Sequence, residues 1–168
     1  LDLKEMINPS LTDGLARRGK AFTPVSFTME GGTAVITGAN MGGKSVALRT
    51  IALNVVLAQS GFFVCAKGAR VPLFDHICLI AEEYQSMQNG LSSFGGEIMQ
   101  LQNAVEKQKQ GYALLIFDEL ARGTNPDEGA AIVKAVVKYL KAKPAMAILA
   151  THYDHVAEDA DYHYQVTG

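Results

Sequence analysis

The residues best suited to chemistry lie between Gly38 and Ser45, which read Gly-Ala-Asn-Met-Gly-Gly-Lys-Ser. This stretch fits the pattern G-x-x-x-x-G-K-[ST], follows a β-branched run at Val35–Thr37 and precedes a long amphipathic segment. The alternative interpretation is a glycine-rich turn with a surface lysine. The presence of a strand before the loop and a helix after it favours a phosphate-binding loop instead. In such a loop the backbone N–H groups turn inward around an anion, and the next helix points its positive N-terminus at the phosphates.

Two side chains of this loop have predicted roles. Lys44 is expected to contact the β- and γ-phosphates of a nucleotide, and Ser45 to ligate Mg²⁺. Phe22 precedes the strand that enters the loop, where P-loop proteins often hold the base. It is a candidate ring for stacking on adenine, and a core phenylalanine is an equally good interpretation. The predicted nucleotide-binding residues are Gly38, Ala39, Asn40, Met41, Gly42, Gly43, Lys44, Ser45, Val46 and Phe22.

Two carboxylates follow the apolar run Leu114–Phe117 further along the chain. Such a run is typical of a central parallel strand, and α/β sheets place their ligands at the carboxyl ends of their strands. Asp118 is expected to hold Mg²⁺, directly or through water, and Glu119 to polarise the attacking water. Because adjacent residues on a strand point to opposite sides, the two can have different roles.

A histidine and a serine pair complete the candidate site. His152 follows the apolar run Ala145–Ala150 and is expected to donate a hydrogen bond to a γ-phosphate. The other three histidines have no comparable position, and we assign them no such role. Ser92 and Ser93 open a helix whose first turn contains Glu97. A helix cap and a phosphate-facing helix N-terminus explain these serines equally well.

The elements that position these residues alternate between strands and helices, which predicts an α/β fold with a mostly parallel sheet and helices on both faces. Residues 1–21 are a lead-in segment whose structure the sequence does not indicate. In the third helix, Asn125 can cap the N-terminus and Glu128 can reach back as in a capping box. The predicted helices are 45–60, 93–110 and one from Pro126 with the apolar stripe Ile132, Ala135, Val136, Tyr139 and Leu140; the predicted strands include Phe22–Met29, Phe62–Cys65, His76–Ile80, Tyr112–Phe117, Ala145–Ala150 and Tyr162–Val166.

The length and composition of the chain limit the kinds of protein it can be. The 168 residues suit a single domain, and 48% hydrophobic with 19% charged residues describe a globular chain. The net charge of −2 does not indicate a nucleic-acid surface within this chain.

Cys65 and Cys78 lie in apolar runs without metal-ligand spacing, so we expect reduced thiols and a cytoplasmic location. No apolar run has transmembrane length, and no Asn-Lys-x-Asp motif indicates a GTPase. The chain begins at Leu1, and we expect it to be part of a longer protein.

Taken together, these motifs resemble the ATPase domain of the MutS family, an ABC-type P-loop NTPase fold, over nearly all of residues 22–156. The resemblance implies an ATP-hydrolysing, Mg²⁺-dependent homodimer with composite sites, in which Ser92 and Ser93 reach the partner's γ-phosphate. It further implies action on DNA through parts of the parent protein outside this chain. The motifs that carry it are Thr37–Ser45, Ser92-Ser93-Phe94 with Glu97, Phe117–Leu120, Arg122-Gly123-Thr124 and Ala150–Tyr153.

Two positions in the loop depart from the pattern of mismatch-repair members. Ala39 stands where those proteins usually have proline, and Val46 where they usually have a second hydroxyl. The chain looks more like the MutS-related branch that suppresses recombination, and like MutS-related ATPases proposed to reactivate cobalamin-dependent aminomutases. Two alternatives follow for the parent protein, namely a nucleotide-driven switch that acts on DNA and a factor that remodels a protein client without a DNA role.

Overall fold

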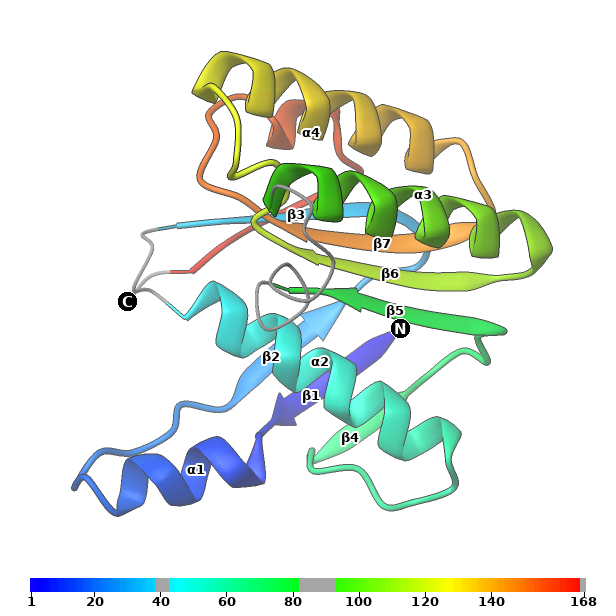
Figure 1. The fold of residues 1–168 in the computed structure, drawn as a ribbon. Coiled ribbons are helices and arrows are strands. Elements are labelled where there is room, and N and C mark those ends of the chain that lie inside the picture. Colours follow the sequence, from blue (N-terminus) through cyan, green and yellow to red (C-terminus); the bar gives the residue numbers. More distant parts are fainter. Residues whose placement is uncertain (39–42, 82–92, 167–168) are drawn as a thin grey trace. The chain divides into compact units, whose positions relative to one another are not determined.

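The computed structural model describes residues 1–38, 43–81 and 93–166 (Figure 1). These residues divide into two compact units. The first comprises Leu1–Glu30 and Ser45–Leu73, and the second comprises Gly31–Lys44 and Phe74–Gly168. None of the described helices is long and apolar enough to cross a membrane.

The first unit contains an antiparallel sheet in the order β2-β1-β4. Residues 1–21, which the sequence left unassigned, supply the central strand β1 and the helix α1. Asn8 caps α1 by accepting a hydrogen bond from the Leu11 N–H at 3.3 Å, and Pro9 follows at the first helical position. The elements are β1 (Asp2–Met6), α1 (Pro9–Ala16), β2 (Val25–Thr28), α2 (Lys44–Gln59, in this unit from Ser45 on) and β4 (Gly68–Arg70).

The strand predicted at Phe62–Cys65 is wrong. Gly61, with φ +78°, ends the turn after α2, and the next residues form no ladder; Phe62 and Phe63 are 68% and 99% exposed. The buried Asn54 accepts a hydrogen bond from the Cys65 N–H at 2.7 Å, and the Cys65 carbonyl accepts one from the Ile7 N–H at 2.7 Å. A side chain and a loop therefore satisfy the backbone here, so no neighbouring strand is needed.

The second unit is built on a five-stranded sheet in the order β5-β6-β7-β3-β8, and every adjacent pair is parallel. This confirms the predicted α/β class and parallel sheet. The helices α3 and α4 both pack on one face of the sheet (Figure 1), and helical cover of the other face stays a prediction. The elements are β3 (Gly32–Thr37), β5 (His76–Ile80), α3 (Ser93–Gln110), β6 (Ala113–Asp118), α4 (Pro126–Lys141), β7 (Ala145–Ala150), the short 3₁₀ turn Ala157–Asp159 and β8 (Tyr162–Gln165).

The helix α4 begins as predicted but buries a different stripe. The Asn125 side chain accepts a hydrogen bond from the Asp127 N–H at 2.9 Å and so caps the helix. Glu128 does not complete a capping box and instead accepts a hydrogen bond from the Thr124 hydroxyl at 2.6 Å. The residues that α4 buries are Gly129, Val133, Val137 and Leu140, so only Leu140 of the predicted stripe is among them.

Asp161 joins β8 to its neighbours in the second unit. Its carboxylate accepts hydrogen bonds from the Thr33 N–H at 2.9 Å and hydroxyl at 3.2 Å, and it pairs with the Lys141 ammonium at 3.0 Å. Burial raises the pKa of Asp161, but these donors together outweigh burial and hold the pKa below its ordinary value. Gly32 has φ +73°, and a side chain there would overlap this carboxylate.

We therefore expect Asp161→Asn to lower the free energy of unfolding by about 1–2 kcal/mol at neutral pH. The folded-state pKa lies below the unfolded value, so the stabilisation is present above an ordinary aspartate pKa of about 3.9 and is lost as the pH falls through the lowered pKa. Urea unfolding of both proteins at neutral and acid pH measures this, with the exposed Asp13→Asn as control. A difference that persists in acid would contradict the assignment.

Candidate functional site

The carboxyl ends of three adjacent strands bring the predicted site residues to one edge of the second unit. The register pairs Asp118 of β6 with Ala150 of β7, and Ala150 with Ile36 of β3. Because β3, β7 and β6 are parallel neighbours, Gly38, His152 and Glu119 follow their strands at the same edge. The structure also brings Lys44 and His152 to Glu119, at 3.5 Å and 3.8 Å from its carboxylate oxygens.

Lys44 begins α2 and lies beside Gly38 and Glu119 in the second unit. Its Nζ donates a hydrogen bond to the Gly38 carbonyl at 2.7 Å, lies 3.5 Å from Glu119 Oε1, and belongs to a side chain that is 2% exposed. Gly38 has φ +136°, and a Cβ there would come within 2.6 Å of the Val166 carbonyl oxygen. Glycine is therefore required where the chain leaves β3.

Glu119 is a buried carboxylate surrounded by basic groups. It follows β6 with φ +55°, and its N–H donates to the Ala150 carbonyl at 3.0 Å. Besides Lys44, the Arg122 guanidinium pairs with Glu119, and His152 Nδ1 lies 3.8 Å from its Oε2. A buried carboxylate needs such compensation, so the site concentrates opposite charges at the edge of the sheet.

Two further residues hold the turn that follows Glu119. The Glu97 carboxylate of α3 accepts a hydrogen bond from the Ala121 N–H at 2.9 Å. The Tyr153 hydroxyl donates to the Ala121 carbonyl at 2.9 Å. Neither contact could be predicted from the sequence, because both join positions far apart in the chain and no local pattern marks them.

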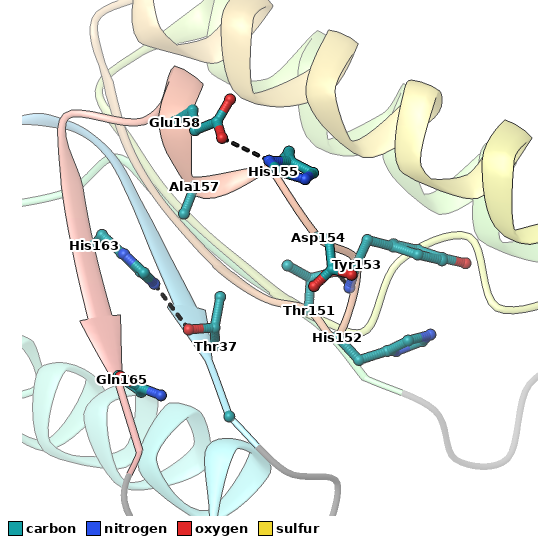
Figure 2. Close-up of a pocket in the computed structure, with 11 residues that line it drawn as sticks. Thr37, Thr151, His152, Tyr153, Asp154, His155, Ala157, Glu158, His163 and Gln165 are labelled. Atoms are coloured by element: carbon teal, nitrogen blue, oxygen red, sulfur yellow. Dashed lines mark hydrogen bonds and ion pairs between the residues drawn. The ribbon is translucent and has the colours of Figure 1, made fainter.

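A pocket of about 560 Å³ opens at the same edge of the second unit (Figure 2). It is lined by Thr37, Gly38 and His152 from the ends of β3 and β7, and by His163 and Gln165 of β8. His163 Nε2 lies 2.8 Å from the Thr37 hydroxyl, so part of its lining is fixed by an internal hydrogen bond.

Comparison with known proteins shows which family the chain belongs to. The family profile described as MutS domain V matches residues 34–168. The chain belongs to the MutS family. It is 37% identical over 135 residues to the DNA mismatch repair protein MutS of Streptococcus equi, and 39% identical over 129 residues to the Endonuclease MutS2 of Alkaliphilus metalliredigens. These alignments cover 80% and 76% of the chain but only 16% of each relative.

The remaining predicted residues of this MutS-family chain stay predictions. Ser45, Val46 and the half-buried Phe22 belong to the first unit, whereas Asp118 ends β6 in the second, so the pairing of Ser45 with Asp118 on a metal is not tested. Ala39, Asn40, Met41, Gly42 and Ser92 lie outside the described residues. Ser93 begins α3, but its side chain is not described.

Proposed function

We propose that this chain binds and hydrolyses Mg-ATP and acts as the nucleotide-driven switch of a longer MutS-family protein. The observation that carries the proposal is the cluster of Lys44, Glu119 and His152 beside Gly38. It combines a cation for the phosphates, a carboxylate for the attacking water and a further donor at one sheet edge. Phosphoryl transfer needs little beyond such positioning and charge neutralisation.

Each residue has a distinct part in the proposed reaction. Water attacks the γ-phosphorus, the bond to the β–γ bridging oxygen breaks, and the products are ADP and inorganic phosphate. Glu119 orients the water and accepts its proton, while Lys44 neutralises charge on the β- and γ-phosphates. His152 donates to a γ-phosphate oxygen. Its imidazole lies near Glu119, so both can act on the same phosphoryl group.

The residues assigned to magnesium have suitable chemistry. Asp118 offers a carboxylate and Ser45 a hydroxyl, and Mg²⁺ prefers such oxygen ligands together with phosphates. When bound, the ion would neutralise charge on the transferring group. Asp118 precedes Glu119 at the end of β6, so the second unit presents one carboxylate for the metal and the next for water.

Membership of the MutS family supports a proposal for the wider assembly. We propose a homodimer in which Ser92 and Ser93 complete the partner's ATP site, in a cytoplasmic protein. The relatives named for DNA mismatch repair and as an endonuclease support a role on DNA. The MutS and MutS2 relatives match at similar identity, so a DNA switch of either branch is our first proposal. A factor that remodels a protein client is the alternative, since Ala39 and Val46 depart from the mismatch-repair pattern.

The full-length protein tests these proposals through phosphate release and DNA binding, each measured with and without Mg-ATP. We expect Mg²⁺-dependent phosphate release whose rate per molecule rises with protein concentration, as composite sites require. We also expect stabilisation by about 2.7 kcal/mol when ATP is at 100 times its dissociation constant. DNA affinity that falls with salt and changes with ATP would support the DNA switch.

Other results would overturn specific parts. Absence of both phosphate release and ATP-dependent stabilisation would overturn the ATPase proposal. Turnover that is linear in protein concentration, without association, would overturn the composite site. Hydrolysis with no DNA binding at low salt would favour the protein-client alternative.

A further inference from the structure

The backbone of Ala121 is held on both sides, at the peptide that precedes it and at the peptide that follows it. Its N–H donates to Glu97 Oε2 at 2.9 Å, and its carbonyl accepts from the Tyr153 hydroxyl at 2.9 Å. Ala121 is buried and has φ +66°, a left-handed conformation that is uncommon for a residue with a Cβ. Such a conformation persists only when its surroundings over-determine it, and these two hydrogen bonds do so.

The tyrosine is built into this position. Its ring is buried in the core under α4, beside the exposed His152 ring with centroids 4.5 Å apart. Burial and the nearby Glu97 and Glu119 carboxylates raise the pKa of Tyr153, so the hydroxyl keeps its proton and stays a donor. A Cβ at Gly129 would overlap the hydroxyl oxygen and lie 2.6 Å from the ring carbon Cζ. Glycine in α4 therefore leaves the space that this hydrogen bond occupies.

The turn that is fixed in this way carries the functional carboxylate. Glu119, also with positive φ, lies two residues before Ala121, and its partner Arg122 follows directly. Rotation about the backbone bonds of Ala121 would move Glu119 and Arg122 relative to each other. It would also change the 3.5 Å separation between Glu119 and Lys44.

We propose that Glu97 and Tyr153 are positioning residues, which clamp the backbone on both sides of Ala121 and thereby aim Glu119 at the attacking water. The clamp rests on the proposed ATPase function and deepens it. Glu97 lies in the first turns of α3, the helix that begins at Ser93. The clamp therefore couples the start of α3 and the segment after β7 to the residue that activates water.

Turnover of the full-length protein tests the clamp through Tyr153→Phe and Glu97→Ala. Each change removes one hydrogen bond to Ala121, and we expect kcat to fall roughly tenfold while KM for Mg-ATP stays within about twofold, because misplacement of a reacting group affects the chemical step. Glu97→Gln keeps an oxygen acceptor of the same length and should restore most of kcat. In a Glu119→Gln background, Tyr153→Phe should cause no further loss, because both changes act through Glu119.

A second variant leaves both clamp residues in place. Gly129→Ala should push the Tyr153 hydroxyl off Ala121 and lower kcat in the same way. Hydrogen exchange of the segment around Ala121, followed by mass spectrometry, reports the clamp independently of turnover and should speed up in Tyr153→Phe, Glu97→Ala and Gly129→Ala.

The possible results distinguish failure of the clamp proposal from failure of the ATPase proposal. Faster exchange around Ala121 with unchanged kcat would overturn the clamp and leave the ATPase intact. Unchanged exchange in the three variants would overturn the clamp, whatever kcat does. A wild-type protein that hydrolyses no ATP would overturn both proposals. A fall in kcat that Glu97→Gln does not restore would assign Glu97 a role other than holding Ala121.

Discussion

Glu119→Gln is expected to lower the rate of phosphate release by about a hundredfold to ten-thousandfold while Mg-ATP stays bound. The amide keeps the size of the side chain and an oxygen that can accept a hydrogen bond, but it cannot take a proton from water. The substitution also removes the negative charge that faces Lys44 at 3.5 Å and pairs with Arg122. Repulsion between the site and the triphosphate should therefore decrease, and ATP should bind at least as tightly as in the wild type.

Single-turnover phosphate release and nucleotide binding by calorimetry measure the two effects separately. Glu106→Gln is the matched control, because Glu106 is an exposed glutamate of α3 that pairs with Lys109 three residues further along the same helix. It should leave both quantities unchanged. Wild-type turnover in Glu119→Gln would show that another group activates the water, and the role assigned to Glu119 would then be wrong.

The sequence predicts the site where its signals are local. Gly38, Glu119 and His152 each follow an apolar run that ends at a polar residue, and a parallel sheet places such ends at one edge. Short patterns of this kind indicate the strand, its direction and its last residue at once. The structure places these strand ends at one edge, and the family profile confirms membership of the MutS family, whereas the roles of the residues stay predictions.

Features that depend on contacts between distant parts of the chain could not be predicted from the sequence. The strand β1 is held by β2 and β4, and nothing within Asp2–Met6 itself distinguishes it from a polar loop. Phe62 and Phe63 have the composition of a buried strand and are exposed. The helix α4 has two apolar stripes that could face the core. It buries the stripe that contains Gly129, because only a residue without a side chain fits against the Tyr153 ring.

The Ala121 clamp shows the same limit at the site itself. Its hydrogen bonds span 24 residues to Glu97 and 32 residues to Tyr153. Neither a glutamate in the first turns of a helix nor a tyrosine after a histidine has a spacing that would reveal a shared partner. Only the packing of α3 against β5 and β6, together with the position of Tyr153 after β7, brings both side chains to the backbone of Ala121.

Lys44→Met is expected to weaken ATP binding by about a hundredfold. Methionine keeps much of the apolar stem but lacks the ammonium that donates to Gly38 and faces Glu119. Truncation of one partner in a buried charge pair costs about 2–5 kcal/mol, and 1.4 kcal/mol corresponds to a tenfold change in affinity. In this variant the triphosphate would meet the Glu119 carboxylate without the lysine between them, so phosphate release should also fall.

Calorimetric titration with Mg-ATP measures this loss, and urea unfolding shows whether the fold persists. Lys107→Met, a change of the same kind at an exposed position of α3, should bind ATP as the wild type does. Lys44→Arg separates charge from geometry. It keeps the cation, but the rigid guanidinium fork does not reproduce a compact ammonium on a flexible stem. If the loop requires the ammonium itself, Lys44→Arg will lose nearly as much affinity as Lys44→Met. Wild-type affinity in a folded Lys44→Met protein would mean that Gly38–Ser45 is not the phosphate-binding loop.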